Sequence, residues 1–81
     1  MIYLDSLKKH KKGTYCHMVA DDIEELHVFA ESLGLKREYL HKAKIQHYDL
    51  TPNKRILAVK KGAVEVSSRE IILLDKKKRQ S

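Results

Sequence analysis

Helix start signals recur three times in this chain, and each one directly follows a short run that is predicted to be a strand. The three pairs of run and signal are 15–20 with Asp21, 47–50 with Thr51-Pro52, and 63–66 with Ser67. A side-chain oxygen before a helix accepts a hydrogen bond from a free N–H of the first turn, and proline suits the first helical position because it has no N–H to leave unpaired. Short strands that alternate with capped helices predict a small α/β or α+β fold.

The helix after Asp21 has the clearest predicted boundaries. Glu24 follows Asp21 at the spacing of a capping box. Apolar residues recur at helical spacing as far as Leu33, and Gly34 suits the left-handed position that ends many helices. We therefore predict a helix that begins at 21–24, with Asp21 as its N-cap, and ends before Gly34.

The run EIILL at 70–74 is compatible with a strand as well as with a helix. Ser67 and Glu70 have the spacing of a capping box, and the lysines that follow complement the negative end of a helix dipole. We therefore predict a helix from Ser68 to about Lys77 rather than a strand.

The complete set of elements predicts one domain with a single sheet layer. The elements are strands at 2–4, 15–20, 47–50 and 63–66, helices at 21–33, 52–61 and 68–77, and a short helical turn at 36–42. The polar and basic residues at 6–14 predict a loop. We expect three to four short strands packed by three helices, in a compact domain at 1–75 with a basic C-terminal tail at 76–81.

The charge balance is basic, with 17 Lys and Arg against 11 Asp and Glu and a formal net charge of +6. Such a balance favours polyanionic partners, namely nucleic acid or a phosphate-bearing ligand. Much of the charge lies in two runs, which are Lys8, Lys9, Lys11 and Lys12, and Lys76, Lys77, Lys78 and Arg79. Solvated segments that keep a small protein soluble explain both runs equally well.

Cysteine content and hydropathy limit the cellular setting. One cysteine in 81 residues excludes an intramolecular disulfide framework and is typical of a reducing cytoplasm. No apolar run approaches the ~18 residues of a membrane span, and the first basic residues follow the first apolar ones, unlike a signal peptide. We expect a cytoplasmic protein with no membrane partner, and the oligomeric state stays open.

Imidazole and carboxylate side chains gather on two of the predicted strands. His47 and Asp49 lie two residues apart, so they face the same side of a strand just before a helix N-terminus, which favours anions. On the strand at 15–20, His17 faces the opposite way from Cys16, so a Cys–His nucleophile pair is not expected. If the two strands are neighbours, His17 and His47 share one site.

These residue types suit a divalent metal ion such as Zn²⁺ or Mn²⁺. The predicted ligands are His17, Asp21, His47 and Asp49, with His27 and Asp5 in reserve. Such a site activates water for attack on a phosphoester, and Arg55 is expected to stabilise the charge on the phosphate oxygens. Without a metal, His17 and His47 are a candidate general acid–base pair. The predicted catalytic residues are therefore His17, His47, Asp49 and Arg55. No HExxH, CxxC or P-loop motif is present, so the sequence leaves open whether the protein is an enzyme.

Two non-enzymatic functions compete with this site. A nucleic-acid-binding module would use the basic surface, with contacts from Lys8, Lys9, Lys11, Lys12, Tyr48 and Arg55. An inhibitor or adaptor of the phage type would instead occupy a host protein, and the polar residues would then be structural. In that case Asp21 is only a helix cap.

Four segments combine into a pattern that extends over most of the chain. They are CHMVAD at 16–21, ELHVFAESLGLKREYL at 25–40, HYDLT at 47–51 and KRILAVKKGAVEVSSRE at 54–70. From Ile2 to about Glu70 the chain resembles a family of short bacterial and phage proteins catalogued as a domain of unknown function. The family pattern centres on positions that match His17, Asp21, Leu26-His27, His47-Tyr48-Asp49, Arg55 and Gly62-Ala63. The resemblance implies no activity, but it implies that polar residues, and not packing residues alone, define the family. The lysine runs are particular to this sequence.

Overall fold

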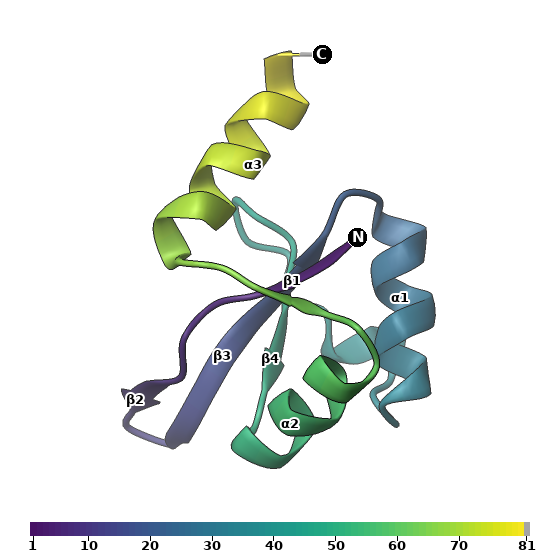
Figure 1. The fold of residues 1–81 in the computed structure, drawn as a ribbon, viewed down its shortest axis with the longest axis vertical. Helices are drawn as coiled ribbons and strands as arrows, with labels where there is room; N and C mark the ends of the chain where they lie inside the picture. The colour runs from purple at the N-terminus through teal and green to yellow at the C-terminus, as the bar shows by residue number, and fades with distance from the viewer. Residues whose placement is uncertain (81) are drawn as a thin grey trace.

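Five strands form one mixed sheet around the longest strand, β3 (Gly13–Ala20). The computed structural model describes residues 1–80, with side chains through residue 78 (Figure 1). β4 (Tyr48–Leu50) pairs antiparallel with one edge of β3. β1 (Ile2–Leu4) and β2 (Lys8–His10) both pair antiparallel with the other edge, and β5 (Val64–Glu65) is a parallel neighbour of β1. The result is the expected compact α+β fold, with five strands instead of three to four.

A bulge separates β1 from β2. Leu4 pairs with Met18 and Lys8 pairs with Tyr15, so the three residues 5–7 span only two residues of β3. One extra residue in a strand interrupts the ladder and re-aims the neighbouring side chains. The bulge lies opposite Cys16-His17, which brings Asp5 beside His17.

The hydrophobic core lies on one face of the sheet, under α1 (Ile23–Ser32) and α2 (Pro52–Lys60) (Figure 1). Its buried side chains from strands and helices are Ile2, Leu4, Cys16, Met18, Ala20, Leu26, Ala30, Leu33, Tyr48, Leu50, Ala58 and Ala63. Alternate strand residues point to opposite faces of a sheet. His17 and Asp49 therefore lie on the face that α1 and α2 leave open.

The third helix, α3 (Ser68–Gln80), packs on this other face through Ile71 and projects beyond the sheet (Figure 1). Its capping box forms as predicted, because the Glu70 N–H donates to Ser67 Oγ at 3.1 Å. The helix includes the EIILL run and continues into the segment expected to be a tail. Among the described residues, no helix combines the length and the apolar character that crossing a membrane requires.

Local signals place most helix ends correctly. Thr51 Oγ1 accepts from the Lys54 N–H at the start of α2. Gly34 has a φ of 86°, and the Leu35 N–H donates to the Ala30 carbonyl at 3.0 Å, which is the Schellman end predicted for α1. The predicted N-cap of α1 is wrong by one residue, because Asp22 rather than Asp21 accepts the N–H of Glu25.

Two connecting segments differ from their predictions. The predicted loop at 6–14 contains β2, because β3 extends beyond β1 and offers an unpaired edge with which Lys8–His10 can pair. We call residues 8–15 the lysine hairpin. The helical turn predicted at 36–42 is shorter, since the 3₁₀ helix η1 covers only Arg37–Tyr39 and His41 instead forms a β-bridge with His47.

Candidate functional site

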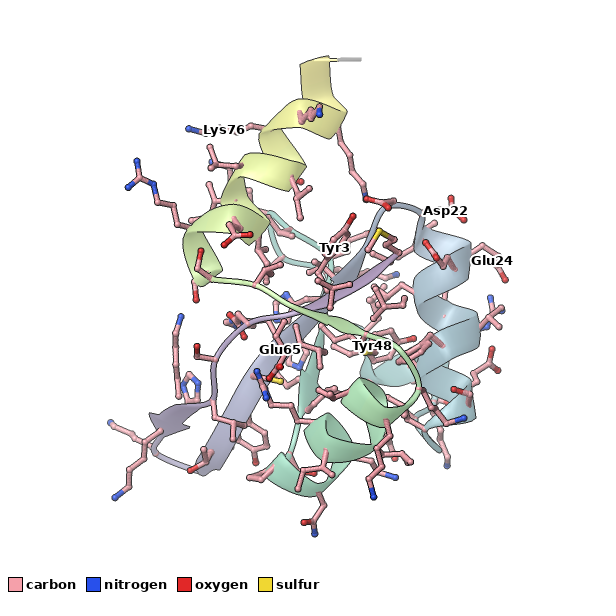
Figure 2. The ribbon with its side chains drawn as sticks, in the orientation of Figure 1. Tyr3, Asp22, Glu24, Tyr48, Glu65 and Lys76 are labelled. Atoms are coloured by element: carbon pink, nitrogen blue, oxygen red, sulfur yellow. The ribbon has the colours of Figure 1, made fainter. Side chains whose placement is uncertain are left out.

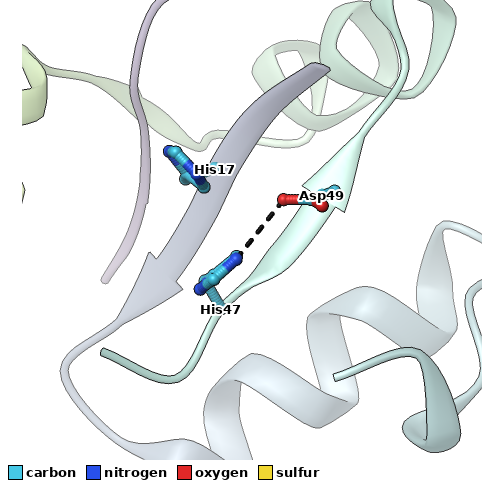
Figure 3. Close-up of side chains that lie close together, drawn as sticks. All are labelled: His17, His47 and Asp49. Carbon is cyan, nitrogen blue, oxygen red and sulfur yellow. Dashed lines mark ion pairs between the residues drawn. The ribbon is translucent and has the colours of Figure 1, made fainter. Parts of the chain in front are cut away.

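The pairing of β3 with β4 places His17 directly opposite Asp49. His47 lies just before β4, and its ring is 4.8 Å from the His17 ring, centroid to centroid, at an angle of 89°. One ligand atom from each of His17, His47 and Asp49 lies within 4.8 Å of the other two (Figure 3). Because ligand atoms on one ion lie roughly 3–4 Å apart, an ion among these three side chains requires only small side-chain movements.

Both histidines of this cluster have Nδ1 bound to an oxygen. His17 Nδ1 lies 2.7 Å from Asp5 Oδ2, and His47 Nδ1 lies 2.8 Å from the carbonyl oxygen of Ile45. These oxygens only accept, so each Nδ1 carries the hydrogen and donates it. In the neutral form of each ring, the lone pair therefore lies on Nε2. Metal-bound histidines in proteins are commonly held in this way.

Asp5 is the buried partner of His17. Its carboxylate is 1% exposed, and Oδ1 also accepts the His17 backbone N–H at 2.6 Å while Oδ2 accepts from Ser68 Oγ at 3.1 Å. Burial alone would raise the pKa of Asp5, but the hydrogen bonds from the His17 ring, the His17 backbone and Ser68 outweigh it and lower the pKa. Asp5 is therefore ionised at neutral pH and fixes the orientation of His17.

His41 is a member of the site that the sequence analysis missed. Its Nε2 lies 3.2 Å from Asp49 Oδ2, and its ring stacks on His47 with the centroids 5.1 Å apart and an interplanar angle of 4°. The other oxygen of Asp49 lies 3.4 Å from His47 Nε2. The signal that could have found His41 is its spacing from His47, which fits a short antiparallel loop once the helical turn ends at Tyr39.

Asp21 does not join the cluster, so this predicted ligand is a correction. It lies four residues after His17, and a strand rises ~3.3 Å per residue, so the separation along the strand is ~13 Å. Its carboxylate accepts from the Tyr3 hydroxyl at 3.1 Å and from the ammonium group of Met1 at 3.1 Å. Asp21 therefore has a structural role and does not cap α1.

Arg55 lies on α2, on the opposite side of the sheet from His17. Its Nε and Nη2 donate to the Asp5 carbonyl oxygen at 3.2 and 3.1 Å, and its Nη1 pairs with Glu65 at 2.9 Å. These contacts connect α2 to the bulge after β1 and to β5. The guanidinium is therefore engaged in the fold, and the predicted role of Arg55 on phosphate oxygens is a second correction.

Tyr48 is also a core residue rather than a contact surface. Its side chain is fully buried beneath α1, and its hydroxyl lies 2.6 Å from His27 Nδ1 (Figure 2 shows Tyr48 between α1 and the sheet). A base cannot stack on a ring that is enclosed in the core. The same hydrogen bond occupies His27, so neither residue belongs to the site.

Cys16 faces the core, opposite to His17, as the strand alternation predicts. It is 1% exposed, and burial raises the pKa of its thiol to about 11. We expect the thiol of the folded protein to be protonated and unreactive toward a disulfide reagent at pH 8. The absorbance of the thiolate that the reagent releases should not rise in buffer. In denaturant it should rise to one equivalent per chain. Rapid release in buffer would contradict the buried position.

A cavity of about 630 Å³ opens beside the cluster, between β3, the loop at 43–47 and α3. Its polar lining consists of Asp5, Lys8, His17, Lys44, His47, Ser68, Asp75 and Lys76, and its apolar lining consists of Val19, Ala43, Ile45, Ile71 and Ile72. Lys8 Nζ lies 2.5 Å from Ser68 Oγ and 3.9 Å from Asp5 Oδ2. The volume is in the range of small-molecule sites.

Comparison with known proteins gives one match. The model of a family described as "Protein of unknown function (DUF4031)" matches residues 2–78. The search of curated proteins found no match, and neither did the search of solved structures. The match extends eight residues beyond the end of the resemblance seen in the sequence.

Proposed function

The chain belongs to this family of proteins of unknown function, and we infer its activity from the geometry of its own site. We propose that it is a divalent-metal-dependent phosphoesterase with His17, His47 and Asp49 as the metal ligands. The observation that carries the proposal is the convergence of these three side chains on the open face of the sheet. Two imidazoles and one carboxylate that leave further positions open are typical of a catalytic metal site.

The environment of the cluster supports both the ion and an anionic substrate. Asp5 and the Ile45 carbonyl hold the two imidazoles so that both Nε2 lone pairs remain available. A divalent ion in this position supplies Lewis acidity toward a phosphate oxygen and an activated water. Lys8, Lys44 and Lys76 line the adjoining cavity with Asp5 and Asp75, so the lysines outnumber the carboxylates among its described lining residues and favour the negative charge of a phosphate.

Hydrolysis forms a bond from the water oxygen to phosphorus and breaks the bond from phosphorus to the leaving oxygen. One proton leaves the water and one proton is taken up by the leaving group. His41 is half exposed beside Asp49, so it is placed to carry a proton between the site and solvent. The products are a phosphate monoester and an alcohol when the substrate is a diester.

Metal titration tests the ligand set directly. Calorimetry with Zn²⁺ or Mn²⁺ on chelator-treated protein should show one site per chain. His17→Ala and His47→Ala should each weaken metal binding by at least about 100-fold. Loss of an outer-shell partner already costs up to about 100-fold, and loss of a ligand should cost at least as much. His10→Ala is the matched control, because His10 lies in the lysine hairpin outside the cluster, and it should bind like the wild type.

Hydrolysis of bis(4-nitrophenyl) phosphate distinguishes the metal-dependent mechanism from a metal-free acid–base mechanism. Chelator should abolish the activity, and the bound ion should restore it. Activity that persists in chelator would favour a metal-free acid–base pair of His17 and His47. If no metal binds and no ester is hydrolysed, the proposed function is wrong.

A further inference from the structure

Among the described residues, three lysines line the cavity together with the carboxylates of Asp5 and Asp75. Lys8 begins the lysine hairpin and lines the cavity near Asp5, while Lys76 lies on α3 and lines it farther along that helix. An α-helix rises ~1.5 Å per residue, so Ser68 and Lys76 are separated by ~12 Å. The hairpin and α3 project from the body in different directions (Figure 1), and Lys76 points outward (Figure 2). An extended ligand with several negative charges can therefore contact lysines at separate points along the cavity.

The hairpin continues the positive charge well outside the cavity. Lys9, Lys11 and Lys12 are exposed, and no carboxylate forms an ion pair with them in the part of the chain that the structure describes. A small phosphate ester in the cavity would contact only the cations that line it. The additional lysines are therefore suited to the successive phosphates of a polymer.

The wall of the cavity indicates which chemical group of such a polymer, between two of its phosphates, the cavity can hold. Val19, Ile45, Ile71 and Ile72 give it a mainly apolar surface next to the histidines. A nucleoside base offers an uncharged face that such a wall can cover. In a duplex that face is stacked within the helix, and bringing it out costs a few kcal/mol per nucleotide.

We propose that the substrate of the site is a single-stranded nucleic acid, bound between the lysine hairpin and α3 with one nucleoside in the cavity. The identification as a substrate rests on the proposed function, while the binding itself does not require the metal. The phosphate next to the bound nucleoside lies at His17, His47 and Asp49. DNA and RNA share this chemistry, and separate measurements with each distinguish them.

Fluorescence anisotropy with a labelled 12-nucleotide strand, in chelator to prevent hydrolysis, tests the binding. The variant K9Q/K11Q/K12Q should bind at least about 10-fold more weakly at low salt. Its slope of log affinity against log salt should be shallower by about 2, because each phosphate contact on a single strand contributes about 0.7. The control K36Q/K60Q/K61Q removes the same charge from exposed positions near α1 and α2 and should bind like the wild type.

A second pair of variants tests the cavity. Ile72→Glu places a negative charge in the lining at a position that is 49% exposed, so the fold should tolerate it. Leu73→Glu is the matched control, because Leu73 is 54% exposed on the same helix and does not line this cavity. Binding should weaken about 10-fold for Ile72→Glu and stay unchanged for Leu73→Glu.

The outcomes separate this inference from the proposed function. Equal affinity for duplex and single strand, equal affinity for a mononucleotide and the 12-nucleotide strand, or no loss in K9Q/K11Q/K12Q would each overturn the inference. Metal binding and hydrolysis of bis(4-nitrophenyl) phosphate would be unaffected by those results. Conversely, single-strand binding without metal binding would leave a nucleic-acid-binding protein and refute the phosphoesterase.

Discussion

Asp49→Asn should lower metal-dependent phosphoester hydrolysis by at least about 100-fold, with little effect on stability. Asparagine keeps the size of the side chain but removes the negative charge that, under this proposal, would neutralise the bound ion. It also removes the charge that faces His41, whose Nε2 lies 3.2 Å from Asp49 Oδ2. Because Asp49 is 33% exposed on the open face of the sheet, the core beneath it is not disturbed.

The measurement is kcat/KM for bis(4-nitrophenyl) phosphate at saturating metal, with a thermal melt of each variant. Glu38→Gln is a suitable control, since it neutralises an exposed carboxylate in η1, outside the cluster. Its activity should equal that of the wild type. Full activity in Asp49→Asn would show that this carboxylate is not a ligand.

Asp5→Asn should destabilise the protein by about 1–3 kcal/mol, which is the cost of an unpaired group in a buried hydrogen-bond network. An amide has one acceptor oxygen, so it cannot accept from both the backbone N–H and the ring N–H of His17. If its NH₂ group faces the ring, the hydrogen of His17 moves from Nδ1 to Nε2. Metal affinity should then fall by about 10- to 100-fold.

Acid titration of stability gives a second measure of Asp5. Its pKa is lowered in the folded state, so the ionised carboxylate contributes stability that is fully present above the unfolded pKa of about 4. That contribution is lost as the pH falls through the folded pKa. The gap in unfolding free energy between wild type and Asp5→Asn should therefore be largest near neutral pH and shrink below about pH 4.

Ser68→Ala provides a graded comparison for Asp5→Asn. It removes one hydrogen bond to the Asp5 carboxylate and leaves both bonds from His17 in place. We expect a cost of about 0.5–1.5 kcal/mol and unchanged metal affinity. Denaturant melts and the same metal titration check both values. Equal effects from Ser68→Ala and Asp5→Asn would mean that Asp5 does not orient His17.

The elements that could be predicted are those with local causes. Caps and end residues such as Thr51 and Gly34 act within a few positions of the chain, so both ends of α1 and α2 and the start of α3 were placed to within two residues. The shared face of His47 and Asp49 followed from strand alternation. Their meeting with His17 required only that the two strands be neighbours.

The parts of the site that were missed depend on pairing between distant segments. His41 reaches Asp49 because the chain turns back at 41–47 to form a bridge, which no local motif announces. Asp21 and its neighbour Asp22 are equally good N-cap residues, so the sequence alone does not decide between them. Arg55 was misassigned because its charge suggested phosphate, whereas its position on α2 directs it to the Asp5 carbonyl oxygen.

The bulge at residues 5–7 separates the part of the sheet that holds the cluster from the lysine hairpin. On one side of the bulge, β1, β3 and β4 hold the histidines and Asp49 in register. On the other side, β2 pairs only with the first residues of β3. A residue gained or lost between Asp5 and Lys8 would shift the register of β2 on β3 and turn the β2 side chains to the other face, while Asp5 would stay beside His17. At the hairpin tip, Lys11 and Lys12 contribute no pairing to the cluster. The lysine hairpin can therefore change in length and charge without moving Asp5, the two histidines or Asp49.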